Sequence, residues 1–366
     1  MKKILVIGQT PPPFGGQALM INRMLEGTYA NARLYHLRMA YSKDMDDLGK
    51  IRLGKSFHTI SIIFRAVYLR LRHNIRVLYY PPSGPSILPM FRDITLLVCI
   101  RWMFKSTIFH FHAAGLSDSY LKLPRLARWL FRRAYFNPDI AIQLSSFNPD
   151  DAALLSAKST YFVPNGIEDE YLAMGCPSKP DNSVCRVLFV GLVSESKGVL
   201  VLIEAIRILR DSGVRVKVSV VGKFASESFE RTVLSQISEL GLGDIFDFTG
   251  VLVGQAKHEQ YLAADIFCFP TFFECESFGL VAVEAMQFQV PVIISRWRGV
   301  QSLIDDGNEG FIVPVQDAKA VAEKIALLAA NPELRVRMGR IGRERYLQHY
   351  SIEMFYQRMD DCFANV

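Results

Sequence analysis

Three carboxylates stand in a stretch of the chain that otherwise has the composition of a protein core. The stretch FPTFFECESFGLVAVEAMQFQVPVIIS covers residues 269–295 and contains Glu274, Glu276 and Glu284. A carboxylate in such surroundings is costly unless it holds a hydrogen-bonding ligand. Eight helical residues would place Glu276 and Glu284 ~12 Å apart, beyond the ~5–9.5 Å between the paired carboxylates that cleave a glycosidic bond. The two groups are therefore expected to hold different parts of one ligand.

The second half of the chain alternates strand and helix patterns around these carboxylates. The predicted strands are 186–191, 215–222, 245–249, 265–269, 291–295 and 310–313. The predicted helices are 198–211, 227–240, 258–263, 279–287, 318–330, 332–349 and 352–363. This alternation is typical of a parallel sheet covered by helices on both faces. Ligands of such sheets bind at the carboxyl ends of the strands.

The first half shows a similar pattern, beginning with a strand, a glycine-rich turn and a helix. Its predicted strands are 3–7, 77–80, 107–111, 139–143 and 161–163, and its predicted helices are 18–25 and 94–104. A stretch rich in Pro, Gly and polar residues, 168–182, is the best linker. The sequence thus predicts an α/β protein of two facing Rossmann-like domains. Their expected bounds are 1–170 and 171–350, with a C-terminal helix, 351–366, packing back on the first domain.

Composition excludes several classes of protein. The chain has 366 residues, 50% hydrophobic and 21% charged, which is ordinary for a globular enzyme. Its six cysteines show no CxxC spacing, which disfavours a disulfide framework or a zinc site and fits a reducing cytoplasm. No apolar run is long enough for a signal peptide or a membrane span. The acidic run 44–47 contains an Asp-x-Asp, but it is interpreted as a solvated loop, so no metal is expected.

Basic charge is concentrated in the first half. Residues 1–170 hold 22 Lys and Arg against 12 Asp and Glu, and two segments, 51–78 and 121–136, contain bases but no acid. Apolar residues recur at helical spacing in the second segment, which predicts a basic amphipathic helix. Contact with anionic lipid headgroups is the favoured interpretation, on a face formed by Arg125, Arg128, Trp129, Arg132 and Arg133, with shallow apolar insertion expected of Trp129, Leu130 and Phe131. A solvated helix face is the alternative; nucleic acid is disfavoured, since no binding motif accompanies the bases.

Several motifs, taken in order, resemble the retaining glycosyltransferases of family 4, which have the GT-B fold. They are FVGLVSESKG at 189–198, the E-x7-E segment ESFGLVAVE at 276–284, DGNEGF at 306–311 and NPELR at 331–335. In the first half, PPPFGG at 11–16 and FHFH at 109–112 resemble enzymes of bacterial exopolysaccharide, capsule and O-antigen (lipopolysaccharide) assembly. The resemblance covers nearly the whole chain.

The resemblance implies a role for each matching residue. Glu276, Lys197 and His112 would be catalytic, with Glu276 on the transferred sugar and Lys197 on the departing diphosphate. The residues it assigns to donor binding are Gly15, Gly16, Gly191, Lys197, Phe278, Gly279, Leu280, Glu284 and Arg298.

Each assignment has a structural alternative. Glu284, assigned to the ribose, is otherwise an exposed helix residue, and His112 is otherwise a hydrogen-bonded structural histidine, which is the favoured interpretation of His110. Gly15 and Gly16 are otherwise an ordinary turn, and the same holds for the Asn-Gly pair at 165–166. Glu274 lies outside the motif spacing and is interpreted as structural.

One position departs from the family pattern. The family usually has an arginine directly after the glycine that ends the first strand of the second domain, and here that residue is Leu192. A lost guanidinium removes a charge-assisted contact to the donor diphosphate. Arg296 or Arg298, which follow strand 291–295, are candidates to replace it.

The resemblance implies a metal-independent hexosyltransferase without a cofactor. It would move a sugar, with retention, from a UDP- or GDP-linked donor to a lipid-linked glycan, as a cytoplasmic protein peripheral on the inner face of the cell membrane. Two alternatives remain: a sugar-nucleotide epimerase of the same fold, and a catalytically silent, membrane-docked partner of a polysaccharide assembly complex.

Overall fold

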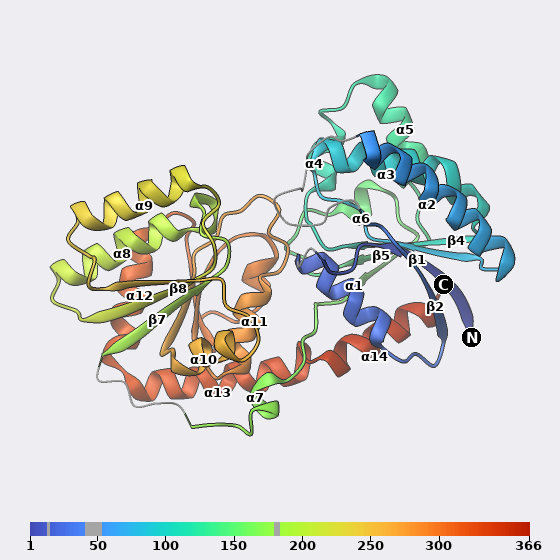
Figure 1. Ribbon diagram of the computed structural model, residues 1–366. Helices are drawn as coiled ribbons and strands as arrows, with labels where there is room; N and C mark the ends of the chain where they lie inside the picture. The colour runs from blue at the N-terminus through green and yellow to red at the C-terminus, as the bar shows by residue number, and fades with distance from the viewer. Residues whose placement is uncertain (13–14, 41–52, 179–183) are drawn as a thin grey trace. The chain divides into compact units, whose positions relative to one another are not determined.

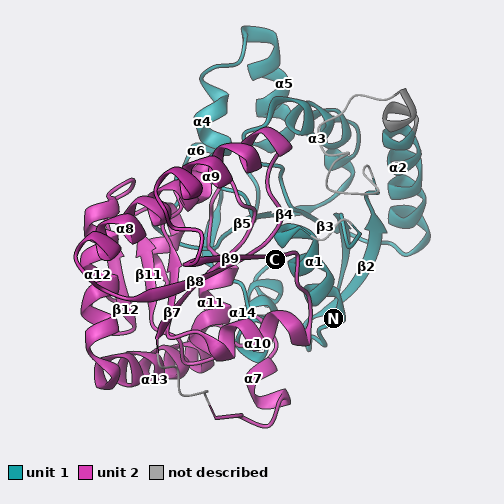
Figure 2. Ribbon diagram, turned by 60° about the vertical axis from the view of Figure 1, so that its left-hand side comes forward, with its two compact units in different colours: residues 1–166, 352–366 teal, residues 167–351 magenta. Residues whose placement is uncertain are grey.

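The computed structural model describes residues 1–12, 15–40, 53–178 and 184–366, with only the backbone described at 53–57. The chain divides into two compact units (Figure 2): unit 1 comprises residues 1–166 and 352–366, and unit 2 comprises residues 167–351. The acidic run 44–47 lies outside the described residues, as do Pro13, Phe14 and Arg52 from the motif and the basic segment.

Unit 1 is built on a parallel six-stranded sheet with the order β2-β1-β3-β4-β5-β6. The strands are β1 (Lys2–Gly8), β2 (Ala32–Arg38), β3 (Val77–Tyr80), β4 (Ser106–Phe111), β5 (Ile140–Gln143) and β6 (Ser159–Phe162). The helices are α1 (Gly16–Glu26), α2 (Leu53–Arg72), α3 (Ile87–Ile100), α4 (Leu116–Tyr120), α5 (Arg125–Tyr135), α6 (Asp151–Leu154) and α14 (Ile352–Ala364), with a 3-10 turn, η2 (Arg101–Met103), after α3.

Helices cover both faces of this sheet, which explains why nearly all residues of its central strands are buried. Helices α2, α3 and α5 lie on one face, and α1 and α14 on the other (Figure 1). Ile4 to Ile7 of β1 are fully buried. The C-terminal helix α14 belongs to unit 1: the Phe363 ring contacts the Tyr29 ring edge-on at 5.0 Å, and the Asn31 amide donates to Asp360 Oδ1 at 3.0 Å.

Unit 2 carries a second parallel six-stranded sheet, with the order β12-β11-β10-β7-β8-β9. The strands are β7 (Cys185–Val190), β8 (Val216–Val221), β9 (Phe246–Gly250), β10 (Ile266–Phe269), β11 (Val292–Ser295) and β12 (Gly310–Val313). The helices are α7 (Glu170–Ala173), α8 (Val199–Asp211), α9 (Glu227–Glu239), α10 (Gln255–Ala263), α11 (Leu280–Gln287), α12 (Ala318–Ala330) and α13 (Pro332–His349), with 3-10 turns η3 (Glu195–Lys197) and η4 (Arg298–Ser302).

Two six-stranded parallel sheets, each covered by helices, confirm the predicted fold class. The sequence prediction missed β2 and α2, and it began α3 at residue 94 instead of Ile87. β2 is an edge strand of mixed exposure, so it lacks a clear apolar pattern, and α2 carries apolar residues on more than one face. The 3-10 turn η2 replaces the predicted last turn of α3. The expected linker includes the short helix α7.

Candidate active site

The carboxyl ends of β7 and β10 mark the point in unit 2 where the order of strands reverses. β7 lies between β10 and β8, so the connection from β7 to β8 and the connection that returns to β10 proceed in opposite directions. Ligands of open α/β sheets bind at such a switch point. The segments that follow β7, β10 and β11 contain Lys197, Glu276 and Arg298, respectively. The topology therefore brings together residues that are far apart in the sequence.

Lys197 and Glu276 form an ion pair at this edge. Lys197 Nζ donates to Glu276 Oε2, and the two side chains are only 17% and 12% exposed. The ammonium also lies 4.6 Å from the centre of the Phe273 ring and 5.4 Å from that of Phe269, within the range of cation–π attraction. The two residues that the sequence assigns to the diphosphate and to the sugar thus contact each other in the ligand-free protein.

Backbone contacts fix the turn that carries Lys197 against the loop after β10. The Phe272 amide donates to Ser196 O at 2.7 Å, and Thr271 Oγ1 donates to the same oxygen at 3.3 Å. Gly198 begins α8 with a φ of 85°, and a Cβ there would overlap Pro270 O. Only glycine combines this left-handed conformation with such a close approach.

Glu284 projects from α11 and is held by two residues of α10. Its Oε1 accepts from Lys257 Nζ at 2.8 Å, and its Oε2 accepts from the Tyr261 hydroxyl at 2.7 Å. Tyr261 is fully buried, and burial followed by the charge of Glu284 raises its pKa well above the ordinary value. The side chain of Glu284 is about one-fifth exposed, so it is not the freely exposed helix residue of the alternative interpretation.

The sequence analysis missed Lys257 and Tyr261. They stand four residues apart and so share one face of α10, but the predicted helix began only at His258 and left Lys257 outside it. The helix in fact begins at Gln255, and a prediction with that start would have placed Lys257 and Tyr261 on the same helical face.

The start of α11 provides backbone donors beside the ion pair. Gly279 caps the helix with a φ of 84°, and Leu280 is its first residue. The Phe278 side chain is buried, with its ring edge-on to Tyr350 at 5.7 Å, so only its backbone can face a ligand. The eight-residue helix directs its first amides toward the sheet edge, where they favour an anion.

Arg298 lies near the loop that carries Glu276, whereas Leu192 contributes no positive charge to the site. Arg298 opens η4 with a φ of 40°, and its guanidinium carbon is 5.5 Å from the centre of the Trp297 ring. Burial and Glu274 raise the pKa of the Cys275 thiol, and the charges of Arg298 and Lys197 oppose that rise. Arg298 therefore acts electrostatically on the loop that carries Glu276. Leu192, at the end of β7, is 43% exposed.

In unit 1, the predicted histidines are buried at the carboxyl end of the sheet: His110 lies in β4, and His112 directly follows it. His110 Nδ1 is 2.6 Å from the Tyr79 hydroxyl, and the rings of His110 and His112 lie 4.0 Å apart. Burial lowers the pKa of His112 to about 3 and the pKa of His110 well below its usual value. Both imidazoles are therefore neutral near pH 7. Gly15 caps α1, with open space where a Cβ would project.

The predicted membrane face on α5 is only partly exposed. Arg125, Arg132, Arg133 and Trp129 are exposed, but Arg128 Nε donates to Leu123 O at 2.7 Å and holds the turn before the helix. The expectation that Phe131 inserts into a bilayer is wrong, because its ring is fully buried among Tyr120, Tyr135 and Phe136.

Two further observations concern the described residues alone. Their helices include none with the length and apolar character that a membrane crossing requires. In the same ranges, no three His, Cys, Asp or Glu side chains are grouped as a metal ion would need.

Comparisons with known proteins agree with this architecture. The family model described as glycosyl transferases group 1 matches residues 179–345, which include Lys197, Glu276 and Glu284. The chain is 30% identical over 180 residues to the capsular polysaccharide biosynthesis glycosyltransferase CapM of Staphylococcus aureus, covering 48% of this chain and 44% of that protein. It is 34% identical over 211 residues to the D-inositol 3-phosphate glycosyltransferase of Saccharomonospora viridis, covering 56% and 46%. The chain thus spans about half the length of the curated relatives it matches.

Solved structures match over the whole chain. Sucrose-phosphate synthase from Thermosynechococcus elongatus superposes with a TM-score of 0.71 at 20% identity, covering 99% of this chain and 98% of that one. HepE of Anabaena, in complex with UDP, superposes with a TM-score of 0.74 at 17% identity, covering 100% of both. At these identities the likeness establishes the fold. The chain therefore has the GT-B fold, and residues 179–345, within its second unit, match the model of the glycosyl transferases group 1 family.

Proposed function

We propose that the protein is a retaining glycosyltransferase of family 4 type that moves a sugar from a nucleotide-diphosphate sugar to a lipid-linked glycan acceptor. Unit 2 binds the donor, and unit 1 binds the acceptor. The acceptor would belong to the assembly of a cell-surface polysaccharide, a proposal supported by relatives named for capsular polysaccharide and for colanic acid biosynthesis.

The ion pair between Lys197 and Glu276 at the switch point carries the proposal. A donor supplies an anionic diphosphate and neutral sugar hydroxyls, which are the groups that an ammonium and a carboxylate bind. On donor arrival, Lys197 exchanges Glu276 for the diphosphate, and Glu276 accepts hydrogen bonds from the sugar. As the bond to the anomeric carbon breaks, charge develops on the leaving diphosphate, and Lys197 and the first amides of α11 stabilise it.

Glu284 is proposed to bind the ribose hydroxyls of the donor. Lys257 and Tyr261 hold both of its oxygens in the ligand-free protein, so the carboxylate is oriented before the nucleotide binds. Since a carboxylate oxygen accepts more than one hydrogen bond, Glu284 can accept from a ribose while it keeps these partners. We assign a UDP- or GDP-linked donor; one neighbour, HepE, has been solved with UDP.

The neutral state of His112 fits a positioning role and not that of a general base. An inverting enzyme needs a general base for the acceptor hydroxyl, and an effective base has a pKa near the working pH. A histidine whose pKa burial lowers to about 3 is a poor base, but it can still hydrogen-bond a sugar hydroxyl. We therefore assign His112 to positioning, and Gly15 and Gly16 to close backbone contact with the substrates. No step requires a metal ion or a cofactor.

The protein is proposed to work at the inner face of the cell membrane, where a lipid-linked acceptor is accessible. Arg125, Arg132, Arg133 and Trp129 are exposed on unit 1 and suit an anionic surface.

A catalytically silent, membrane-docked role is the second candidate, because Leu192 stands where the family pattern has an arginine. An epimerase of the same fold would release the free nucleotide without needing an acceptor. The deciding experiment measures nucleotide release from a panel of nucleotide sugars, with and without a lipid extract. Release that depends on the lipid extract supports transfer, release without it supports the epimerase, and no release from any donor supports the silent role.

A further inference from the structure

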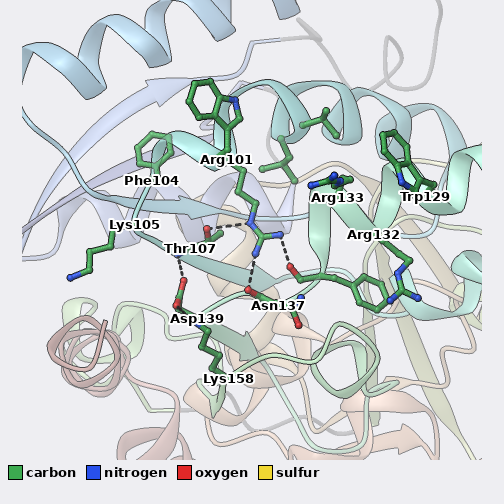
Figure 3. Close-up of a pocket in the computed structure, with 14 residues that line it drawn as sticks. Arg101, Phe104, Lys105, Thr107, Trp129, Arg132, Arg133, Asn137, Asp139 and Lys158 are labelled. Carbon is green, nitrogen blue, oxygen red and sulfur yellow. Dashed lines mark hydrogen bonds and ion pairs between the residues drawn. The ribbon is translucent and has the colours of Figure 1, made fainter.

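Unit 1 contains a cleft of about 700 Å³ between the end of α3, the end of α5 and the starts of β4 to β6 (Figure 3). Five basic residues line it against one acid: Arg101, Lys105, Arg132, Arg133 and Lys158 against Asp139. Apolar side chains of α3 and two tryptophans, Trp102 and Trp129, complete its walls.

Two of these bases form part of the wall. The Arg101 guanidinium donates to the carbonyls of Ala134, Phe136 and Asn137 at 2.7–2.9 Å, and thereby fixes the end of α5 over the start of β4 (Figure 3). Burial lowers its pKa to about 10, so it stays charged near pH 7. Lys158 pairs with Asp139 at 2.6 Å, and the other oxygen of Asp139 accepts from the Thr107 amide at 2.8 Å. The acid that lines the cleft is thus already occupied.

The remaining three bases, Lys105, Arg132 and Arg133, have no carboxylate partner among the described residues. Arg132 lies over the Phe136 ring at 4.8 Å, and Arg133 lies over the Trp129 ring at 5.6 Å, which leaves their N–H groups available. Bases in the last turn of a helix also complement the helix dipole. That explanation does not cover Lys105, which stands outside any helix, just before β4. Three such cations around one cleft suit a phosphate group.

The surroundings of the cleft are apolar and exposed. Trp102 is 77% exposed, Trp129 55% and Leu126 72%. Helix α2 carries a further exposed stripe, made of Ile60, Phe64, Tyr68 and Leu71. Its last turn contacts the turn of Trp102, because Arg70 Nε donates to Met103 O at 3.0 Å. Exposed apolar residues beside unpaired bases are typical of a surface that binds anionic lipid, whereas a hydrophilic glycan would leave the leucines without a partner.

The cleft lies at the end of the sheet opposite to His112. Lys105, Asp139 and Lys158 directly precede β4, β5 and β6, whereas His112 follows β4. The six residues of β4 span ~20 Å. A molecule in the cleft is therefore held away from the proposed substrate residues of this unit, as an anchor and not as a reactant.

We propose that this cleft binds the headgroup phosphate of an anionic phospholipid and docks the protein on a membrane, with Trp102 and Trp129 at the lipid interface. The proposal deepens the membrane location given above and rests on the proposed function only for that location. Nucleotide release from soluble donors, measured without vesicles, tests the transferase separately, so the two can fail independently.

The test uses flotation of the full chain with vesicles of phosphatidylcholine, with and without phosphatidylglycerol, at physiological salt. Lys105→Gln combined with Arg132→Gln is compared with Arg33→Gln combined with Lys122→Gln, which removes the same charge from exposed positions outside the cleft. Binding to phosphatidylglycerol vesicles is expected to weaken about a hundred-fold in the cleft variant, because two charge-assisted hydrogen bonds are lost. In the control variant it is expected to weaken less than about tenfold, because salt screens general surface charge. Thermal unfolding of both variants checks that they fold.

A second measurement locates the contact. The chain has three tryptophans, and Trp297 belongs to unit 2. In single-tryptophan variants, brominated phosphatidylglycerol is expected to quench Trp102 and Trp129. Equal losses in the two charge variants would assign binding to diffuse charge and overturn the cleft site. A lack of quenching or an absence of vesicle binding would also overturn it. The proposal would also be overturned if the protein bound a soluble anionic glycan but not vesicles, and if Lys105→Gln weakened that glycan binding.

Discussion

Lys197 Nζ is paired with Glu276 Oε2, with its ammonium also facing the ring of Phe273. The cation proposed for the diphosphate is therefore neutralised, in the ligand-free protein, by the carboxylate proposed for the sugar. Each group keeps the other paired in a poorly hydrated place, and donor binding must separate them. This arrangement gives Glu276 two opposite effects: it competes with the diphosphate for Lys197, and it positions the sugar.

Glu276→Gln separates these effects. We expect kcat to fall at least about a hundred-fold, because an incorrectly held sugar loses its alignment. Binding of the free nucleoside diphosphate should become several-fold tighter, because Lys197 no longer has a competing carboxylate. Steady-state kinetics and calorimetric titration with UDP and GDP measure the two quantities, and Glu274→Gln is the matched control on the same loop. Near-normal kcat in Glu276→Gln would show that the assignment of Glu276 is wrong.

Glu284→Ala should raise the donor KM with little change in kcat. A ribose contact is made equally in the ground state and the transition state, so its loss weakens binding alone. A hydrogen bond to a charged group contributes about 1.5–3 kcal/mol, which corresponds to at least a tenfold rise in KM. Tyr261→Phe, which leaves Lys257 to hold the carboxylate, should raise KM only a few-fold. If Glu284→Ala lowered kcat and left KM unchanged, the ribose assignment would fail.

The sequence was sufficient to predict the fold, but not the contacts between the candidate site residues. Alternating patterns predict two parallel sheets because buried parallel strands are apolar throughout. The pairing of Lys197 with Glu276 depends on β7 lying next to β10, and no local pattern encodes that neighbour. Phe131 illustrates a second limit: helical spacing shows that a helix is amphipathic, but not which of several apolar side chains faces the core.

Leu192→Arg tests whether a nearby arginine replaces the one absent from the family pattern. If Arg298 supplies that charge to the diphosphate, Arg298→Ala should raise the donor KM about tenfold or more, and adding Leu192→Arg should restore part of the loss. Arg296→Ala, alone and combined with Leu192→Arg, is the matched comparison. An absence of rescue in both double variants, with both single variants active, would mean that neither arginine acts in place of residue 192.

Acid should destabilise unit 1 through its buried histidines. In the unfolded chain a histidine binds a proton below its ordinary pKa of 6.5, whereas burial lowers the pKa of folded His112 to about 3. Between these values the unfolded state binds more protons, so the stability contributed by the neutral imidazole is fully present above pH 6.5 and is lost as the pH falls toward 3. The free energy of unfolding should fall by about 1.4 kcal/mol per pH unit for this histidine, and His110 should add to the slope.

Urea unfolding followed by Trp102 and Trp129 fluorescence, in a Trp297→Phe background, reports on unit 1. His112→Asn should lower the slope by one proton. Equal slopes in the His112 variant and the parent would show that His112 is accessible to protons in the folded protein, and would restore it as a candidate base.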